Sequence, residues 1–169
     1  EYEVAVETAL GGSIQNIVTD NEETAKRMIQ YLKQNKFGRA TFLPLTSVNG
    51  SNYKIQPDVL REQGVIGVAS ALVQVEERFK GLAENLLGRT IVVDHIDHGI
   101  ALARKYKQTL RIVTLEGDLL NPGGAMTGGA FKNTSNLLSR RREIEEFEKT
   151  VKMLKADMEE MERVIEGQK

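Results

Sequence analysis

The sequence predicts a mixed α/β fold made of two similar halves, followed by a long helix. Three observations predict it. Helical and strand-like segments alternate twice along the chain, glycines mark the ends of several segments, and a heptad pattern of apolar residues begins at Ile144. The 169 residues are enough for one domain, or for two half-sized units that share a core.

The first half is predicted to run helix, strand, helix, strand. Gly11 and Gly12 end the first helix, and Asp20 or Asn21 caps the second. A polar loop at 47–59, which contains Pro57, is the predicted boundary between the halves. The four elements are expected at residues 2–10, 13–19, 23–34 and 39–45.

The second half repeats this order. Gly88 ends its first helix, and the strand before Glu116 is expected to form a tight hairpin with the one after Gly117. Both halves show a helix, a glycine, an apolar strand, an aspartate, a second helix and a second strand, which predicts an internal duplication. The expected helices are 75–87 and 100–107, and the expected strands are 90–94, 111–115 and 118–122.

The C-terminal segment has the clearest periodicity. Its apolar residues alternate at spacings of three and four, and charged residues fill the positions between them. This apolar stripe is narrow, which predicts that the helix packs against a partner helix. The alternative is that the helix lies on the surface of its own domain. An incoming helix that continues residues 2–10 upstream is the expected partner, so the chain is predicted to be a piece of a larger protein. The stripe consists of Ile144, Phe147, Val151, Leu154, Met158, Met161 and Ile165.

Composition excludes several classes of protein. With 23 Lys and Arg against 24 Asp and Glu, the chain is not a globally basic nucleic-acid binder, but the composition does not exclude a local basic patch. The absence of Cys excludes disulfides, thiol catalysis and Cys-ligated zinc, and it agrees with a reducing compartment. The sequence shows no membrane-spanning run and no signal-like N-terminus.

The stretch NPGGAMTGGAF packs four glycines into seven positions, which suits either phosphate binding or close approach of another backbone. A phosphate-binding P-loop needs a Lys after its second glycine, but Ala130 follows Gly129. The spacing also fails the dinucleotide-binding fingerprint. Backbone approach, within the fold or between subunits, is therefore favoured, and an internal loop with special dihedral angles is the alternative.

His95 and His98, with Asp94 and Asp97 beside them, are the only candidates for a metal site. They lie where a strand passes into a helix, so capping is the favoured interpretation, with Asp97 as the expected N-cap. No nucleophile motif is present, and nothing else in the sequence argues for catalysis.

Five stretches together resemble the hinge domain of SMC (structural maintenance of chromosomes) proteins of the bacterial type. They are ETALGGSIQNIVTD, GRATFLPLTSV, GVIGVASALVQ, LLGRTIVVD and TLEGDLLNPGGAMTGG, and they extend over nearly the whole chain. The resemblance implies a ring-shaped homodimer whose monomers have two similar α/β subdomains at the tip of a long antiparallel coiled coil. It implies subdomains at 1–52 and 53–136 and the start of a coiled-coil arm at 137–169.

The resemblance also implies roles for particular residues. It places Gly123, Gly124, Gly128 and Gly129 at the dimer interface and a DNA-contacting basic region near the junction with the arm. A lysine run of some relatives is reduced here to Lys132, and an arginine triplet follows it. We expect weak, salt-sensitive DNA contact; the alternative is that the triplet forms ion pairs with neighbouring glutamates. The triplet is Arg140, Arg141 and Arg142.

The predicted function is that of a non-enzymatic dimerisation hinge, which joins two arms for chromosome condensation and segregation. The alternatives are a DNA-sensing module that signals through the arms, and an enzyme with its site at Asp94 to His98. No cofactor is expected in this chain. The resemblance implies ATP and magnesium at the distant heads of the full-length protein, kleisin-type subunits bound there, and a cytoplasmic, nucleoid-associated location.

Overall fold

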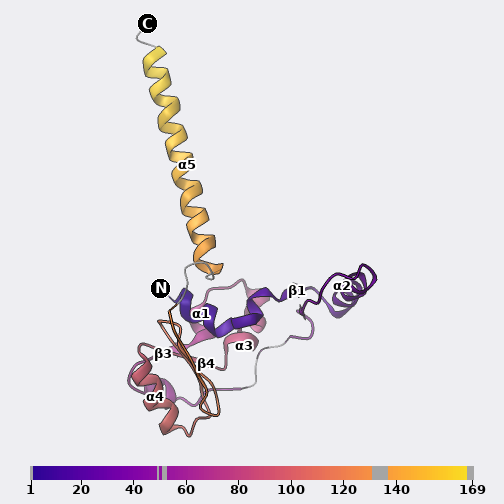
Figure 1. Ribbon diagram of the computed structural model, residues 1–169, viewed down its shortest axis with the longest axis vertical. Coiled ribbons are helices and arrows are strands. Elements are labelled where there is room, and N and C mark those ends of the chain that lie inside the picture. Colours follow the sequence, from indigo (N-terminus) through magenta and orange to yellow (C-terminus); the bar gives the residue numbers. More distant parts are fainter. Residues whose placement is uncertain (1, 49, 51–52, 131–136, 167–169) are drawn as a thin grey trace. The chain divides into compact units, whose positions relative to one another are not determined.

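The computed structural model describes residues 2–48, 50, 53–130 and 137–166. The chain divides into two compact units, Glu1–Ala130 and Phe131–Lys169. The first unit contains two β-sheets and four α-helices among its described residues (Figure 1). The second contains the long helix α5 (Leu137–Glu166). The helices of the first unit are α1 (Glu3–Leu10), α2 (Glu22–Gln34), α3 (Lys80–Leu87) and α4 (Ile96–Lys105).

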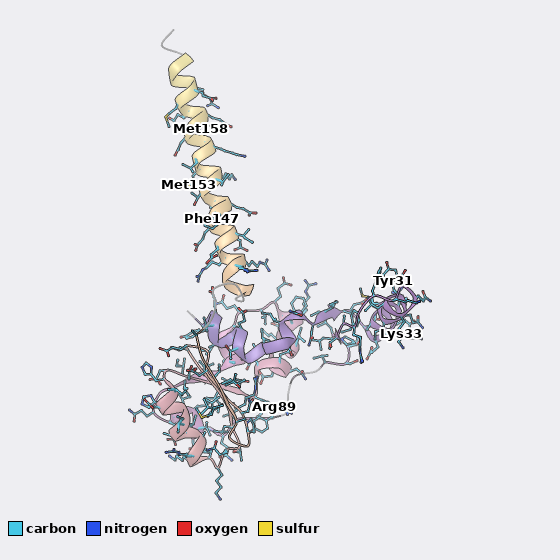
Figure 2. The ribbon with its side chains drawn as sticks, in the orientation of Figure 1. Tyr31, Lys33, Arg89, Phe147, Met153 and Met158 are labelled. Atoms are coloured by element: carbon cyan, nitrogen blue, oxygen red, sulfur yellow. The ribbon has the colours of Figure 1, made fainter. Side chains whose placement is uncertain are left out.

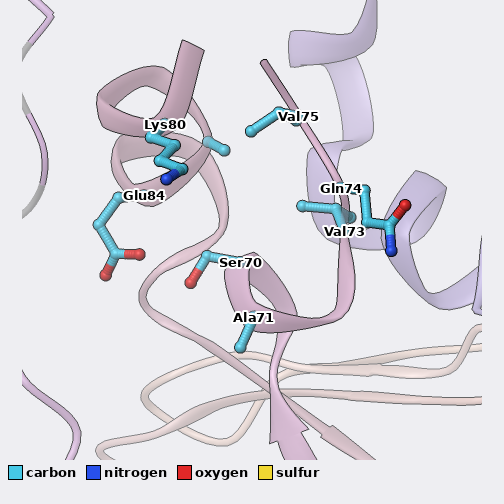
Figure 3. Close-up of a pocket in the computed structure, with 8 residues that line it drawn as sticks. Ser70, Ala71, Val73, Gln74, Val75, Lys80 and Glu84 are labelled. Carbon is cyan, nitrogen blue, oxygen red and sulfur yellow. The ribbon is translucent and has the colours of Figure 1, made fainter. Parts of the chain in front are cut away.

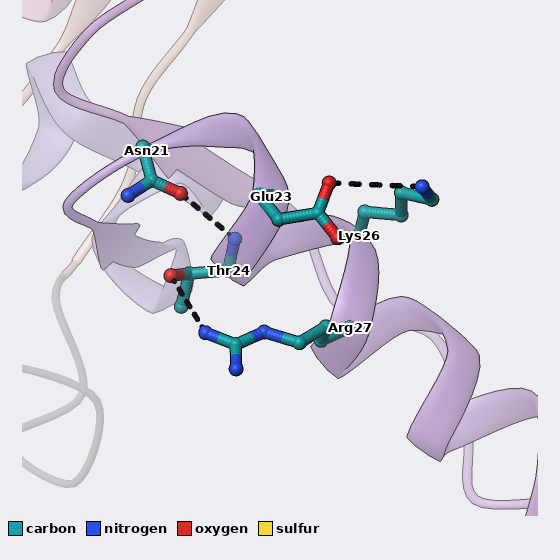
Figure 4. Close-up of polar contacts among 5 residues, drawn as sticks. All are labelled: Asn21, Glu23, Thr24, Lys26 and Arg27. Atoms are coloured by element: carbon teal, nitrogen blue, oxygen red, sulfur yellow. Dashed lines mark hydrogen bonds and ion pairs between the residues drawn. The ribbon is translucent and has the colours of Figure 1, made fainter.

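The smaller sheet pairs β1 (Ile17–Thr19) with β2 (Phe42–Pro44) in parallel, and α2 connects the two strands. Asn21 caps α2, because its side chain accepts a hydrogen bond of 2.9 Å from the Thr24 backbone N–H (Figure 4). This outcome confirms one of the two predicted caps. A parallel pair needs a crossover connection, and the helix supplies it.

The larger sheet has five strands in the order β3-β4-β5-β6-β7. The central pair, β4 and β5, is parallel and fully buried apart from the first residue of β5, and the other neighbours are antiparallel. Its side chains form the core together with α4. The strands are β3 (Val65–Val68), β4 (Thr90–Val93), β5 (Arg111–Thr114), β6 (Leu119–Leu120) and β7 (Met126–Thr127).

The internal repeat is visible in both sheets. The order α1, β1, α2, β2 corresponds to α3, β4, α4, β5, and each pair of strands is parallel. The predicted hairpin of β5 and β6 is also confirmed, with Gly117 at φ 93° in its turn. The two halves differ in the strands β3, β6 and β7, which complete the second sheet. The first sheet, with two strands, leaves Ile17 and Val18 39% and 40% exposed.

Helix α1 precedes the smaller sheet in sequence but packs against α3 and β5 of the larger one. Arg111 fixes its C-terminal end. One guanidinium nitrogen, Nη1, donates to the Ala9 carbonyl at 2.9 Å and to the Thr90 hydroxyl at 2.7 Å. Both partners are buried, and burial lowers the pKa of Arg111. The guanidinium therefore joins the last turn of α1 to the central strands.

Some predicted boundaries were wrong. The helix expected from Val75 begins only at Lys80, because residues before it form an extended segment and the short 3₁₀ helix Glu77–Phe79. The strand expected at 13–19 is reduced to β1, since a second 3₁₀ helix occupies Gly11–Gln15. Strand β3 was not predicted at all.

The apolar stripe of α5 is open to solvent. Its described side chains are 50–67% exposed, with Phe147 at the upper limit (Figure 2). Exposed apolar residues at heptad spacing are typical of a helix that packs against a partner helix. Within the described part of the chain, no helix is both long and apolar enough to cross a membrane.

Candidate functional site

The glycine-rich segment forms the turn between β6 and β7. The Asn121 N–H donates to the Ala125 carbonyl at 2.8 Å, and the Gly124 N–H donates back to Asn121 at 3.0 Å. The Gly123 N–H donates to the Gln108 carbonyl at 2.8 Å, which fixes the turn to the loop before β5. Gly123 and Gly124 have φ angles of 89° and 93°, a conformation that side chains with a Cβ rarely adopt.

The four glycines have different surroundings. A Cβ added at Gly123 or Gly129 would meet no atom of the described residues within 4 Å apart from its chain neighbours, and one added at Gly124 would only touch Gln108 at 4.0 Å. A Cβ at Gly128 would overlap the carboxylate of Asp118, which itself accepts a hydrogen bond from Thr114. A glycine is therefore needed inside the fold at position 128, whereas the described part of the chain leaves open space beside Gly123 and Gly129.

Strand β7 is an edge of the five-stranded sheet. It pairs with β6 on one side, and no strand among the described residues pairs with its other side. Residues 122–130 are all exposed, and the Met126 side chain is 53% exposed. Unpaired N–H and C=O groups along such an edge are available to another strand. The glycine segment thus combines an open strand edge with little side-chain bulk.

A second exposed surface was missed in the sequence. The apolar side chains of β1, α2 and the following turn are only partly covered, because a sheet of two strands does not bury one face of a helix. The apolar residues of α2 have helical spacing in the sequence, so the helix could be predicted. The sequence did not show that the sheet it packs against has only two strands. The residues are Ile17, Val18, Met28, Ile29, Tyr31 and Phe37, which are 39–58% exposed.

The predicted DNA-contacting residues are only partly described. Lys132 lies outside the described residues. The arginine triplet occupies the first turns of α5, where Arg141 pairs with Glu145 at 3.3 Å and Arg142 pairs with Glu146 at 3.8 Å. These contacts are the ion pairs that the alternative interpretation expected. All these side chains are more than half exposed, so the pairs contribute little to stability.

The candidate metal residues form a small local contact. His98 Nδ1 lies 2.7 Å from Asp94 Oδ1, and Asp94 also accepts the His95 backbone N–H at 2.6 Å. The hydrogen bond from His98, followed by that from His95, lowers the pKa of Asp94. His95, and not Asp97, occupies the N-cap position of α4, so the predicted Asp97 cap was wrong.

The part of the chain that the structure describes contains no group of three potential metal ligands. The Asp94 and His98 side chains instead lie against Gly64, at φ 80°, where any Cβ would overlap both of them. The Gly64 carbonyl also accepts the Asp94 N–H at 2.9 Å. The arrangement fixes the turn before β3 to the start of α4, which is a structural role.

A recess between α3 and the segment before it is a concave feature with polar side chains. It has a volume of about 430 Å³ and is lined by Ser70, Gln74, Lys80 and Glu84 together with small apolar residues (Figure 3). Catalysis requires a nucleophile beside a base, or a pair of carboxylates. The recess has one carboxylate, Glu84, and among the described contacts Ser70 makes no hydrogen bond to Glu84 or Lys80, so no nucleophile beside a base is seen there.

Comparison with known proteins agrees with these observations. The family model described as "SMC proteins Flexible Hinge Domain" matches residues 1–103. "Chromosome partition protein Smc" of Bacillus subtilis (strain 168) is 44% identical over 169 residues, which cover 98% of this chain and 14% of the relative. The chain therefore spans about one seventh of the length of that relative.

Two solved structures are similar in fold and sequence. The crystal structure of an asymmetric dimer of the Geobacillus stearothermophilus SMC hinge domain matches with a TM-score of 0.77 and 38% identity, over 96% of this chain and 66% of that chain. The Pyrococcus furiosus Smc hinge domain with an extended coiled coil matches with a TM-score of 0.63 and 30% identity, over 96% and 59%.

These matches confirm the predicted fold class and the predicted resemblance. Both structural matches are hinge domains, and one of them carries a coiled coil, as α5 does in sequence pattern. The family is that of a hinge module and not of a catalytic domain. The chain belongs to the SMC hinge family, of the type found in bacterial chromosome partition proteins.

Proposed function

We propose that this chain is a dimerisation hinge, which joins two coiled-coil arms of a chromosome-organising protein through contact between two copies. The observation that carries the proposal is the open edge of β7, beside glycines whose Cβ positions face empty space. A strand from a second copy fits such an edge, since its backbone groups complete the hydrogen bonds that β7 leaves unpaired. The relatives support self-association, because one matched structure is an asymmetric dimer of a hinge domain.

The partly covered face of the smaller sheet is the proposed counterpart of this edge. The smaller sheet has only two strands, and it leaves apolar side chains of β1 and α2 about 40% exposed. The exposed face of Ile17, Val18 and Ile29 would gain cover from the β7 region of a second copy, with Met126 as an apolar contact. A twofold axis would then create the same contact twice, which closes the assembly.

The exposed heptad stripe of α5 supports the proposed arm. Its partner would be an incoming helix that continues α1 upstream, which gives an antiparallel coiled coil within one chain. The subdomain limits at 1–52, 53–136 and 137–169 belong to this proposal. So do a cytoplasmic location at the nucleoid, a role in chromosome condensation, and ATP-binding heads with magnesium and kleisin-type subunits elsewhere in the full-length protein.

Sedimentation equilibrium of glycine variants tests the interface. Gly123→Ala should weaken the dimer, because the new Cβ points into space that is open among the described residues and that a second copy would occupy. Gly11→Ala is the matched control, since Gly11 also has a positive φ, 52°, and open surroundings, but lies at the end of α1. Equal dimer dissociation constants for both variants would contradict the proposal, provided that both variants fold.

The DNA-sensing module stays the second candidate. Its proposed contacts are Lys132 and the arginine triplet at the start of α5. Charge reversal of the triplet separates the candidates: DNA retention should fall while dimerisation persists. Retention that is unchanged by the reversal would count against a DNA-contacting role for these arginines.

A further inference from the structure

The loop between α4 and β5 contains two consecutive residues in the left-handed region of the backbone. Lys107 and Gln108 have φ angles of 54° and 58°. A residue with a Cβ is disfavoured there, because its Cβ crowds the carbonyl oxygen that follows it. Among the described residues, Lys36 is the only other non-glycine residue with a positive φ. Such strain persists only where the surrounding structure imposes it, and it often marks a functional position.

The internal repeat explains the strain at Lys107 but not at Gln108. Lys36 follows α2 and Lys107 follows α4 at equivalent positions, and a left-handed residue is a common way to end a helix. In both halves the next N–H donates to a carbonyl of the helix, at 3.0 Å for Phe37 and at 2.8 Å for Gln108. Phe37, however, has no positive φ. The left-handed backbone of Gln108 is therefore not needed to end the helix.

The second half differs from the first in carrying the glycine turn. The Gln108 carbonyl accepts the Gly123 N–H at 2.8 Å, and the Gln108 side chain lies 4.0 Å from the place that a Cβ of Gly124 would occupy. As far as the structure describes the first half, it has no strands that correspond to β6 and β7, so Phe37 meets no such turn. The additional left-handed residue thus occurs where its carbonyl contacts the glycine turn.

This contact lies immediately before β7. The Asn121 N–H donates to the Ala125 carbonyl at 2.8 Å, and β7 begins at the next residue, Met126. Strand β7 has two residues, and each of them pairs with one residue of β6. So short a strand has few hydrogen bonds of its own, and the glycines before it have an unusually free backbone. The turn therefore needs a contact outside itself to fix β7, and the Gln108 carbonyl provides one.

The loop that carries Gln108 is itself fixed on both sides. The Thr109 N–H and hydroxyl both donate to the Tyr106 carbonyl, at 3.2 and 2.7 Å. The Tyr106 hydroxyl donates to Glu62 at 3.2 Å, and the Leu110 side chain is buried in the core. The carbonyl of Gln108 is therefore presented to the glycine turn from a well-supported loop.

We propose that Gln108 is a positioning residue for the dimer contact, which holds the glycine turn so that the β7 edge has the register that a second copy requires. The inference rests on the proposed dimerisation through β7. A pre-organised edge loses less conformational entropy when a second copy binds, so the contact should lower the dimer dissociation constant. The strain at Gln108 is then a cost to the fold of one chain that is offset on association.

Two replacements separate the backbone of Gln108 from its side chain. Gln108→Val disfavours the left-handed conformation, because β-branched residues are rare exceptions there, and it should raise the dimer dissociation constant about tenfold or more in sedimentation experiments. Gln108→Gly removes the side chain but accepts the conformation, so its dissociation constant should stay within about threefold of that of the unaltered chain. Circular dichroism checks folding, and Gln108→Thr, also β-branched, replaces the Val variant if that chain does not fold.

Gly117→Ala is the matched control for stability. Gly117 has a φ of 93° and lies in the turn at the opposite end of β6 from the glycine turn. Both Gln108→Val and Gly117→Ala should lower the urea midpoint, because each puts a disfavoured side chain at a positive φ. Only Gln108→Val should weaken the dimer. Hydrogen exchange gives a second readout, since the Gly123 amide should exchange faster in Gln108→Val and at an unchanged rate in Gly117→Ala.

Three results would overturn the role of Gln108. One is a folded Gln108→Val chain whose dimer dissociation constant and Gly123 exchange rate equal those of the unaltered chain. Another is a Gln108→Gly dimer as weak as that of Gln108→Val, because the side chain and not the backbone would then be responsible. The third is equal weakening by Gly117→Ala, which would make the effect one of general stability. An unaltered chain that stays monomeric would instead overturn the proposed dimerisation, and this inference with it, so the two failures are distinguishable.

Discussion

Replacement of Arg111 by Met should destabilise the first unit markedly, because it removes the guanidinium that joins α1 to the sheet. Two hydrogen bonds are lost, to the Ala9 carbonyl at 2.9 Å and to the Thr90 hydroxyl at 2.7 Å. Each bond to a charged group contributes about 1.5–3 kcal/mol, but relief from burying the charge offsets part of that sum. Met retains most of the apolar stem, so we expect a net loss of about 2–3 kcal/mol.

Urea denaturation followed by circular dichroism measures this loss as a lower midpoint at unchanged m. Arg104→Met is the matched control, because Arg104 is exposed on α4 and should change stability by less than about 0.5 kcal/mol. Addition of Thr90→Val completes a double-mutant cycle, in which a coupling energy near 1 kcal/mol is expected for the Arg111–Thr90 pair.

A midpoint for Arg111→Met that matches the Arg104→Met control would refute this reasoning. It would mean that the guanidinium contacts contribute nothing net and that α1 is held by apolar packing alone. A coupling energy of zero, with a large loss for each single change, would refute only the direct Arg111–Thr90 interaction.

Two further predictions concern the contact at the start of α4. Gly64→Ala should lower the free energy of unfolding by about 1–2 kcal/mol or more, because φ is 80° and the new Cβ would overlap His98 and Asp94. Gly38→Ala is the control, since a Cβ at Gly38 meets open space and should leave the free energy of unfolding unchanged. Equal urea midpoints for the two variants would contradict this prediction. The lowered pKa of Asp94 predicts stability that is present above pH 4 and lost as the carboxylate protonates at lower pH. Asp94→Asn should flatten that acid limb in denaturation curves at pH 2–6, and an unchanged limb would count against the prediction.

Local signals in the sequence predicted much of the fold. Asn21 caps α2 through its own side chain, Gly11 ends α1 at φ 52°, and Gly117 turns the β5–β6 hairpin. Each of these features depends on residues within a few positions of one another. The heptad pattern likewise predicted a long helix, and α5 is that helix.

Contacts between distant residues were not predictable in this way. Arg111 reaches Ala9, 102 positions away, and Lys105 pairs with Glu62 at 2.5 Å across 43 positions. The two-residue strand β7 exists because β6 lies beside it, and so short a stretch has no period of its own.

The candidate site was predicted unevenly for the same reason. The four closely spaced glycines were visible in the sequence. That a Cβ at Gly128 would overlap the Asp118 side chain became clear only from the structure. The sequence also did not show that the sheet beside α2 has only two strands, because this depends on which strands pair.

Sedimentation equilibrium of the unaltered chain over a wide range of concentrations tests the central claim most directly. The account predicts a mass near twice 18.9 kDa at sub-micromolar protein, because the β7 edge and the smaller sheet each gain a partner. A single species of 18.9 kDa at micromolar concentration and above would contradict it, and the glycine turn would then be an internal feature of a monomer.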